Sequence, residues 1–369
     1  MSITAKELAK KLELSEAAIS MALNNKPGVS TQTRKRILEA AKENGYDFSR
    51  IQPVENSRPD RGIIYLAVFR KHGALIPDPP VNVISDHGNN VPDVSFFAQL
   101  SEGIASASKN CRFHLNISYL YNEDDIDSFI QEFKRFGAKG VLLLGTEMHE
   151  HDLRPFIKSN IPFVLIDNYF EGQNANCILI NNVQGAYLAT EYLIQKKIGQ
   201  PGYLRSSYMS TGFEERADGF YKAIRKNGMS TSRSIVHQLT PSIDGAYSDM
   251  KELLKNNVEL STCYFADNDL IAAGALRALT EAGYRIPHDI SIIGFDDMPL
   301  CTYITPSLTT IHVPKQYMGE LAVKRLAEII ENPSSCPVKI EIATQIKKKK
   351  ELLKPFLLYL HLKIIQIPG

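Results

Sequence analysis

From Gly62 onward the chain alternates short apolar runs with amphipathic helical segments, and this alternation constrains the fold more than any other feature. Strands that are apolar on both faces and separated by single helices predict an α/β fold with doubly wound parallel sheets. The expected strands are Ile63–Phe69, Phe113–Tyr119, Gly140–Leu144, Phe163–Asp167, Thr262–Phe265 and Ile290–Phe295, with a terminal strand near Val338–Thr344. The expected helices are Phe96–Lys109, Asp125–Phe136, Val183–Gln195, Arg216–Asn227, Tyr247–Asn256, Asp269–Ala282 and Lys315–Ile330.

Polar side chains follow three of these strands. Asp167 comes after VLI, Asn268 after CYFAD and Asp296 after SIIGF, while Arg216 begins an expected helix. Ligands of doubly wound sheets bind at the carboxyl ends of the strands. Carboxylate and amide acceptors with a forked guanidinium donor suit a polyhydroxylated ligand. Taken singly, an Asp or Asn after a strand is also a common cap or turn former. Aromatic side chains available to stack on such a ligand are Phe96, Phe97 and Tyr247.

Residues 1–46 predict a separate unit of three short helices. Thr4 with Glu7 forms a capping box, Ser15 and Ser30 stand at the next two helix starts, and Gly45 closes the third helix. The short link between the first two helices is typical of a helix-turn-helix, whose second helix enters the DNA major groove. Any small helical bundle has such caps, so the pattern alone leaves a purely structural role equally open.

Charge is concentrated where such a unit needs it. The 369-residue chain has a net charge of only +1, but residues 1–50 carry nine Lys and Arg against six acids, a net of +3. The five cysteines have no metal-ligand spacing, so we expect reduced thiols, no metal and no cofactor. No signal peptide or membrane-spanning run is visible, which favours a cytoplasmic protein without membrane contact.

Residues 3–46, ITAKELAKKLELSEAAISMALNNKPGVSTQTRKRILEAAKENGY, resemble the DNA-binding head of the lactose-repressor/galactose-repressor family. The resemblance implies that polar side chains hold the head on phosphates, while Glu16, Ala17 and Met21 occupy base-reading positions. The residues implied at the DNA are Thr4, Ser15, Glu16, Ala17, Ser20, Met21, Asn24, Ser30, Thr33 and Tyr46. By the same resemblance the partner is a double-stranded, palindromic operator bound by a homodimer.

The large domain resembles the effector domain of the same family, which has the two-lobed periplasmic-binding-protein-like fold. The matching blocks are NNVQGAYLATEYLI, RADGF, FADNDLIAAGALRALTEAGYRIPHDISIIGFDD and PSLTTI. The resemblance implies an effector, expected to be a sugar, between the lobes; its binding closes a hinge and changes operator affinity. The implied effector-binding residues are Phe97, Asp167, Arg216, Tyr247, Asn268 and Asp296, with Asp297 expected to be a structural cap.

The expected domain limits follow from these blocks. The head covers residues 1–46, a linker 47–61 and the two-lobed domain 62–346, with an atypical tail at 347–369. One lobe is expected from 62–168 plus 296–330, and the other from 169–293 plus 331–346. The tail begins at four lysines; a frameshift in a lysine-coding run or a divergent segment would each explain it.

The chain departs from the family pattern at several places. Met21 stands where the family usually has an arginine that contacts guanine, and a thioether cannot make that bidentate bond. Glu13 replaces a turn glycine, which costs strain if the left-handed conformation is kept. Pro53 and Pro59 oppose the family's hinge helix. The Pro- and Gly-rich insertion at residues 70–93 suggests a rim loop or a solvent loop without a role.

Three competing functions have distinct sequence requirements. A secreted sugar-binding protein would need a signal peptide and no head. An enzyme on this fold would need a phosphate-binding loop or a nucleophile motif, and neither GxGxxG, GxxxxGK[ST] nor GxSxG is present in the expected context. We therefore expect no enzyme. The remaining alternative is a ligand-binding protein of this fold with weak or no autonomous DNA recognition, because Met21 and the prolines alter the reading surface.

Overall fold

A computed structural model describes residues 3–24, 28–48, 60–70, 96–196 and 199–349. The chain divides into two compact units, residues 1–60 and 61–369. Nearly all of the expected insertion, most of the linker and residues 350–369 of the expected tail lie outside the described ranges, so the predictions for them are untested. Within those ranges, no helix combines the length and the apolar character that crossing a bilayer requires.

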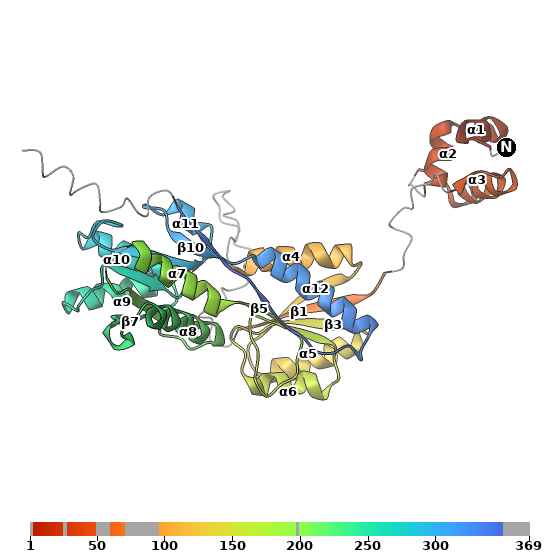
Figure 1. The fold of residues 1–369 in the computed structure, drawn as a ribbon. Helices are drawn as coiled ribbons and strands as arrows, with labels where there is room; N and C mark the ends of the chain where they lie inside the picture. Colours follow the sequence, from red (N-terminus) through yellow and green to blue (C-terminus); the bar gives the residue numbers. More distant parts are fainter. Residues whose placement is uncertain (1–2, 25–27, 49–59, 71–95, 197–198, 350–369) are drawn as a thin grey trace, which may run out of the picture. The chain divides into compact units, whose positions relative to one another are not determined.

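The first unit is a bundle of three helices, as the sequence predicts (Figure 1). They are α1 (Ala5–Leu12), α2 (Glu16–Leu23) and α3 (Thr31–Glu43). Leu8, Ile19 and Ile37, one from each helix, are fully buried at its centre. Packing of these three side chains joins helices that are too short to be stable alone.

All three expected helix caps of the first unit are present. Thr4 and Glu7 form the reciprocal capping box at α1, and the hydroxyls of Ser15 and Ser30 accept the backbone N–H groups at the starts of α2 and α3. Each bond satisfies a donor that a helix start otherwise leaves without a partner, and such a cap contributes about 1 kcal/mol.

Glu13 ends α1 in the left-handed conformation, with φ 54° and ψ 40°. The backbone N–H of Glu13 and that of Leu14 both donate to the carbonyl oxygen of Ala9, which closes the turn before α2. The turn therefore keeps the backbone geometry for which glycine is best suited, and an L-residue with a Cβ pays about 1–2 kcal/mol for it.

The second unit contains two six-stranded sheets with helices on both faces (Figure 1). The first sheet has the order β11-β5-β4-β3-β1-β2, and all its pairings are parallel. Its strands are β1 (Ile63–Phe69), β2 (His114–Leu120), β3 (Gly140–Leu144), β4 (Phe163–Ile166), β5 (Cys177–Ile180) and β11 (Lys339–Ile342). Its helices are α4 (Phe96–Asn110) and α12 (Lys315–Glu331) on one face and α5 (Glu123–Arg135) and α6 (Glu150–Lys158) on the other.

The second sheet repeats this order as β12-β10-β9-β8-β6-β7, with β12 antiparallel to β10 and the other pairings parallel. Its strands are β6 (Gly202–Ser206), β7 (Val236–Leu239), β8 (Cys263–Ala266), β9 (Ser291–Asp296), β10 (Thr309–His312) and β12 (Gln345–Lys347). The helices α7 (Asn182–Lys196) and α8 (Thr211–Lys226) cover one face, and α9 (Ile243–Lys255) and α10 (Asp269–Glu281) cover the other. The short α11 (Leu300–Tyr303) follows β9.

The apolar runs of the sequence are the buried strands of these sheets. Along β1, Ile64, Leu66 and Val68 contact the core under α4 and α12, whereas Tyr65 and Phe69 contact the core under α5 and α6. Alternation of side chains along a strand explains why a continuous apolar run is needed when both faces are covered.

The chain crosses between the sheets three times, as expected, but the strand pairing places the crossings differently from the expected lobe limits. Residues 177–180 and 339–342 pair in the first sheet, and 309–312 pair in the second. Each of these short strands is placed by a partner far away in sequence, which local pattern does not reveal. The tail limit also moves, because Lys347 lies in β12 and the described chain continues to Lys349.

Close approach of α4 to α12 depends on two glycines. A Cβ added at Gly103 would overlap the carbonyl oxygen of Gln316, and one added at Gly319 would overlap that of Leu100. The two helices therefore touch backbone to backbone at these positions, which fixes the distance between them.

We expect Gly103→Ala to destabilise the second unit by about 3 kcal/mol, because the added methyl must push the two helices apart. Gly172→Ala is the matched control, since its Cβ would meet only the Glu150 carboxylate, at 3.5 Å. Urea unfolding of the full chain, followed by circular dichroism, measures both. Equal stability of the two variants would contradict the backbone contact.

We expect Glu13→Gly to stabilise the first unit by about 1 kcal/mol, because glycine adopts the left-handed turn without Cβ strain. The control is Lys42→Gly, at an exposed position inside α3. This substitution is expected to destabilise the first unit by about 1 kcal/mol, because glycine is unfavourable inside a helix. Hydrogen exchange of α1 and α2 peptides in the full chain measures the effect. Faster exchange in Glu13→Gly would be evidence against strain at this turn.

Candidate functional site

Four of the sequence-predicted residues meet between the two sheets. Asp167 follows β4 of the first sheet, Asn268 and Asp296 stand at the carboxyl ends of β8 and β9 of the second, and Arg216 lies on α8. We call these four residues the inter-sheet cluster. Its position agrees with the rule that doubly wound sheets bind ligands beyond the carboxyl ends of their strands.

Arg216 is the centre of the cluster and is buried. Its Nε donates to the Asn182 carboxamide oxygen at 2.9 Å, one Nη donates to the backbone carbonyl of Asp267, and the other lies 3.3 Å from an Asp296 carboxylate oxygen. The guanidinium also stacks on the Phe295 ring, 3.8 Å from its centroid. All three nitrogens are thus held in place before any ligand arrives.

The sequence pattern predicted that a helix begins at Arg216, and this prediction is wrong. Helix α8 begins at Thr211, and the side chain of Ser210 caps it by accepting the backbone N–H of Phe213 at 3.3 Å. Arg216 therefore lies in the second turn, where it points into the sheet edge and is buried. A serine one residue before Thr211 is the signal that locates this start.

Asp167 supplies the contribution of the first sheet. Its φ of 62° is in the left-handed region, and one carboxylate oxygen accepts the hydroxyl of Thr146 at 2.7 Å. Burial raises the pKa of Asp167 from an ordinary value of 3.8 to about 6, while the Thr146 hydrogen bond and the charge of Arg216 act in the opposite direction. The raised pKa brings the titration of Asp167 close to neutral pH. The charges that act on it include those of Arg216 and Asp296, which belong to the second sheet and its helices.

Behind the cluster, Asp267 orients the strand ends, and sequence patterning missed this role. Its carboxylate accepts the Tyr203 hydroxyl and, at 2.6 Å, the backbone N–H of Ser206. The side chain is fully buried, and burial raises its pKa to about 6. Asp267 thereby connects the end of β8 to β6. It also helps to position Asn268, the next residue in the chain.

Asn268 also has a structural role, and the two remaining predicted effector residues, Phe97 and Tyr247, have other surroundings. The carboxamide oxygen of Asn268 caps α10 by accepting the Ile271 N–H at 2.9 Å, so the simple capping role is present. Phe97 packs on Tyr119 of β2, with ring centroids 6.2 Å apart. The neighbouring Phe96 contacts hydrophobic cores of both sheets, so Phe96 is the aromatic side chain that bridges the sheets.

Tyr247 lies apart from the inter-sheet cluster. Its hydroxyl donates to Glu281 at 2.6 Å, and the Arg277 guanidinium stacks on its ring at 4.1 Å. These partners belong to the outward side of α10, because Glu281 and Arg277 are both exposed. A helical pattern alone cannot tell which face of α9 an amphipathic tyrosine occupies.

Direct hydrogen bonds also join the two sheets beside the cluster. The Thr211 hydroxyl donates to the carboxamide oxygen of Asn168 at 2.8 Å. Glu215 accepts from Asn182 at 2.9 Å and from the Tyr169 hydroxyl. Residues 168–169 follow β4, whereas Thr211 and Glu215 are on α8, so the two lobes are held together along this edge.

In the first unit, the predicted DNA-contacting residues fall into two groups. Ser15, Glu16, Ala17 and Ser20 are exposed along the first turns of α2. The second group has intramolecular roles as well: Thr4 and Ser30 cap helices, the Ser30 and Thr33 hydroxyls share a 2.7 Å hydrogen bond, Asn24 donates back to Ser20, and Tyr46 packs edge-on against Phe48.

Met21 is only partly exposed. Its sulfur lies close to Gly28, where an added Cβ would come within 3.0 Å. The thioether therefore packs on the loop between α2 and α3, and it offers no hydrogen-bond donor at a base-reading position. Base contacts from α2 then depend on its exposed residues, Glu16 above all.

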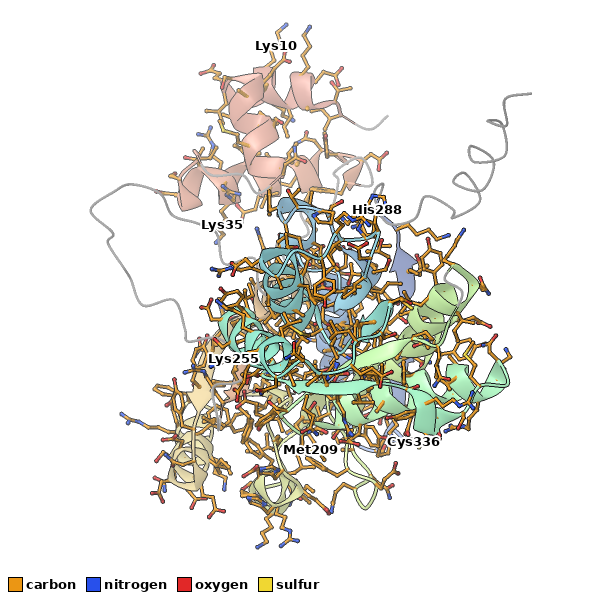
Figure 2. All side chains as sticks on the ribbon, turned by 90° about the vertical axis from the view of Figure 1, so that its left-hand side faces the viewer. Lys10, Lys35, Met209, Lys255, His288 and Cys336 are labelled. Atoms are coloured by element: carbon orange, nitrogen blue, oxygen red, sulfur yellow. The ribbon has the colours of Figure 1, made fainter. Side chains whose placement is uncertain are left out.

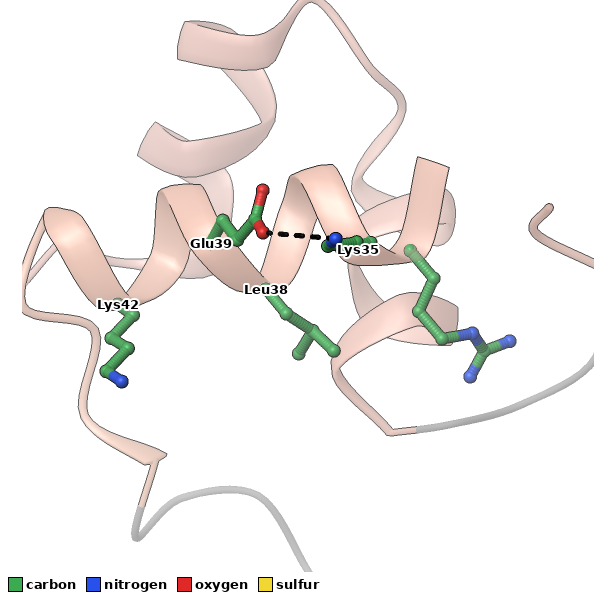
Figure 3. A pocket seen from close by; sticks show the side chains of 5 residues that line it. Lys35, Leu38, Glu39 and Lys42 are labelled. Atoms are coloured by element: carbon green, nitrogen blue, oxygen red, sulfur yellow. Dashed lines mark ion pairs between the residues drawn. The ribbon is translucent and has the colours of Figure 1, made fainter. Parts of the chain in front are cut away.

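Basic side chains project elsewhere from this unit. Lys10 and Lys35 lie on its surface (Figure 2). The outer face of α3 carries Lys35, Lys42 and the half-exposed Leu38, with Glu39 4.0 Å from Lys35 (Figure 3). Such a face is typical of a solvated helix, and its positive charge also favours a polyanion.

Known proteins are similar to this chain in sequence and in fold. Residues 190–350 match the family model described as a periplasmic binding protein-like domain. The curated relative GalS of Salmonella typhimurium, an HTH-type transcriptional regulator, is 30% identical over 325 residues, which cover 87% of this chain and 88% of GalS.

Two solved structures show the same architecture. The transcriptional regulator CelR in complex with cellobiose has a TM-score of 0.66 at 22% identity, over 94% of this chain and 98% of CelR. The lac repressor dimer bound to operator and the anti-inducer ONPF also has a TM-score of 0.66, at 20% identity, over 96% of this chain and 100% of that one. At these identities the likeness concerns the fold.

We expect Asp167→Asn to change how stability depends on pH. A carboxyl group whose pKa is raised on folding contributes stability at pH 4 that is lost as the pH rises through about 6. The variant lacks this titration, so its free energy of unfolding relative to the parent should rise between pH 4 and 7. We expect a rise of at most about 2 kcal/mol, since partial exposure of Asp167 screens part of the effect. Urea unfolding across this range measures it, with exposed Asp124→Asn as control. A constant difference between variant and parent would contradict a raised pKa.

Proposed function

The chain belongs to the lactose-repressor/galactose-repressor family of transcription regulators, and from that premise we propose that residues 3–46 bind operator DNA under the control of an effector in the second unit. The effector is expected to be a sugar. The observation that carries this proposal is the inter-sheet cluster: Asp167 of one sheet faces Arg216 and Asp296 of the other. A ligand that contacts all three must favour one arrangement of the lobes over another.

The cluster suits hydroxyl recognition. Asp167 and Asp296 are acceptors for ligand hydroxyls, Asn268 adds an amide, and Arg216 holds Asp296 in position. The half-buried Phe96 packs against the cores of both sheets and is a candidate to stack on the ligand. Phe97 remains a proposed wall residue, whereas the partners of Tyr247 argue against a role for it in binding.

Operator binding is proposed for the exposed start of α2. Glu16 can accept from a cytosine amine and Ala17 can contact a thymine methyl, while the hydroxyls of Ser15 and Ser20 suit phosphates. The remaining residues of the predicted set, including Thr4, Asn24, Ser30, Thr33 and Tyr46, support the bundle and its phosphate contacts. A homodimer would place two such helices on a palindromic site.

The alternative is a ligand-binding protein of this fold that does not read DNA by itself. It is favoured by Met21, whose packing on Gly28 leaves no bidentate contact with guanine. The two functions differ in one measurable property, because phosphate attraction alone gives no sequence preference and falls steeply with salt.

Selection of binding sites from random duplex DNA at physiological salt tests operator recognition with the full chain. We expect a palindromic site, and we expect Glu16→Ala to relax the preference at one base pair of each half-site by about 1–3 kcal/mol. Glu39→Ala makes the same charge change on α3 and should leave the preference intact. Binding without sequence preference would support the alternative.

The effector response is tested on the selected site with a panel of sugars. Arg216→Ala should bind the operator but lose the response, because Asp296 loses its partner. Arg205→Ala, which removes a half-exposed pair with Glu214 on the same sheet, is the control and should respond normally. If Arg216→Ala unfolds, Asp296→Asn replaces it. A normal response in both cluster variants would disprove the assigned site.

A further inference from the structure

The surroundings of the inter-sheet cluster carry an excess of negative charge. The carboxylates are Asp167, Glu215, Asp267, Asp269 and Asp296, and the cations among the described residues that interact with them are Arg216, Lys315, Arg205 and Lys339. Two of these cations pair elsewhere: Arg205 with Glu214 at 2.7 Å, and Lys339 with the Tyr169 ring at 3.2 Å.

The two buried cations both bind acceptors of the protein. Each of the three nitrogens of Arg216 donates to a protein oxygen, as described above. The Lys315 ammonium donates to the backbone carbonyls of Val313, Asp296 and Asp297, and only 2% of this residue is exposed. Lys315 cannot receive a phosphate or carboxylate group without breaking these bonds, and the positive charge of Arg216 is already balanced by Asp296.

The carboxylates, in contrast, have capacity left. Asp167 accepts from Thr146 with one oxygen, and Asp296 accepts from Arg216 with one oxygen. The second oxygen of each accepts no hydrogen bond from any residue in the part of the chain that the structure describes. The negative charge of Asp296 adds to burial in raising the pKa of Asp167, so the two carboxylates are close enough to repel each other and any further anion.

We propose that the effector carries no phosphate or carboxylate group: the inter-sheet cluster selects an uncharged polyhydroxylated molecule and rejects the phosphate esters and uronates of the same sugar. This inference rests on the proposed effector site and specifies the chemical class that the site takes. Hydroxyl groups donate to the open oxygens of Asp167 and Asp296, whereas an anion meets two carboxylates whose cationic neighbours among the described residues are already paired within the protein.

The size of the discrimination follows from electrostatics in a partly buried site. At an effective dielectric constant of about 20, a charge held some 6 Å from a carboxylate is repelled strongly enough to weaken binding roughly 100-fold. Glu215 contributes to this field without being expected to touch the ligand, because it is held by Asn182 and Tyr169. Neutralising Glu215 therefore removes negative charge near the site without removing a group that is expected to bind the ligand.

The experiment begins with the full chain incubated with a small-molecule extract of bacterial cells, followed by mass spectrometry of the bound compounds. We expect enrichment of an uncharged polyhydroxylated compound relative to Arg216→Ala. Enrichment of a phosphorylated or carboxylated compound would overturn the inference and leave the proposed function standing. If no polyhydroxylated compound is enriched, the proposed effector site fails, and this inference fails with it.

Calorimetry then compares the enriched sugar with its phosphate ester and its uronate at pH 7.5, where Asp167 is largely ionised. The parent protein should bind both anionic derivatives at least about 100-fold more weakly than the sugar. Glu215→Gln should narrow this ratio about tenfold, whereas Asp218→Asn, an exposed change on the same helix, should not alter it. An unchanged ratio in Glu215→Gln would show that steric fit, and not charge, excludes the anions.

Discussion

The buried guanidinium of Arg216 is the interaction on which the arrangement of the second unit depends. Its partners come from the start of α7, the end of β8 and the end of β9, and its flat face lies on Phe295. Removing such a charge from water is costly, and the cost is offset only if every donor finds an acceptor in good geometry. The bonds of Arg216 therefore fix where three elements end relative to one another.

The same edge holds conformational strain. Asp167, Asp296 and Asp297 all have positive φ values, of 62°, 106° and 52°. Residues other than glycine rarely adopt this backbone conformation, and each one lowers the stability of the fold by on the order of 1–3 kcal/mol. Strained carboxylates beside a buried guanidinium form an edge whose groups are organised in advance, and the two large cores on either side stabilise the unit enough to hold it.

The sequence allowed the main features of this organisation to be predicted, for physical reasons that also explain the failures. Strands such as β1 and β3 are long apolar runs, and helix caps such as Thr4 and Ser15 act through neighbours three residues away. The strands β5, β10 and β12 are only three or four residues long, and distant partners decide where they pair.

The candidate site shows the same division between local and distant information. Asp167, Asn268 and Asp296 could be singled out because they stand at the carboxyl ends of strands. Asp267 was not singled out, since its function depends on Tyr203, 64 residues away. The hydrogen bond from Tyr247 to Glu281 was not foreseen, because periodicity defines a helix but leaves open which neighbour the tyrosine meets.

The repeated strand order, with three crossings between sheets, has a consequence for synthesis on the ribosome. The first sheet lacks its β11 edge until residue 342 has emerged, and the second lacks β12 until residue 347 has emerged. Neither sheet can therefore complete its hydrogen-bonded edge until these late residues have been made. A growing chain with an open strand edge is exposed to pairing with other chains. The architecture that brings two sheets to one ligand thus delays the protection of both until nearly all of the described chain has been made.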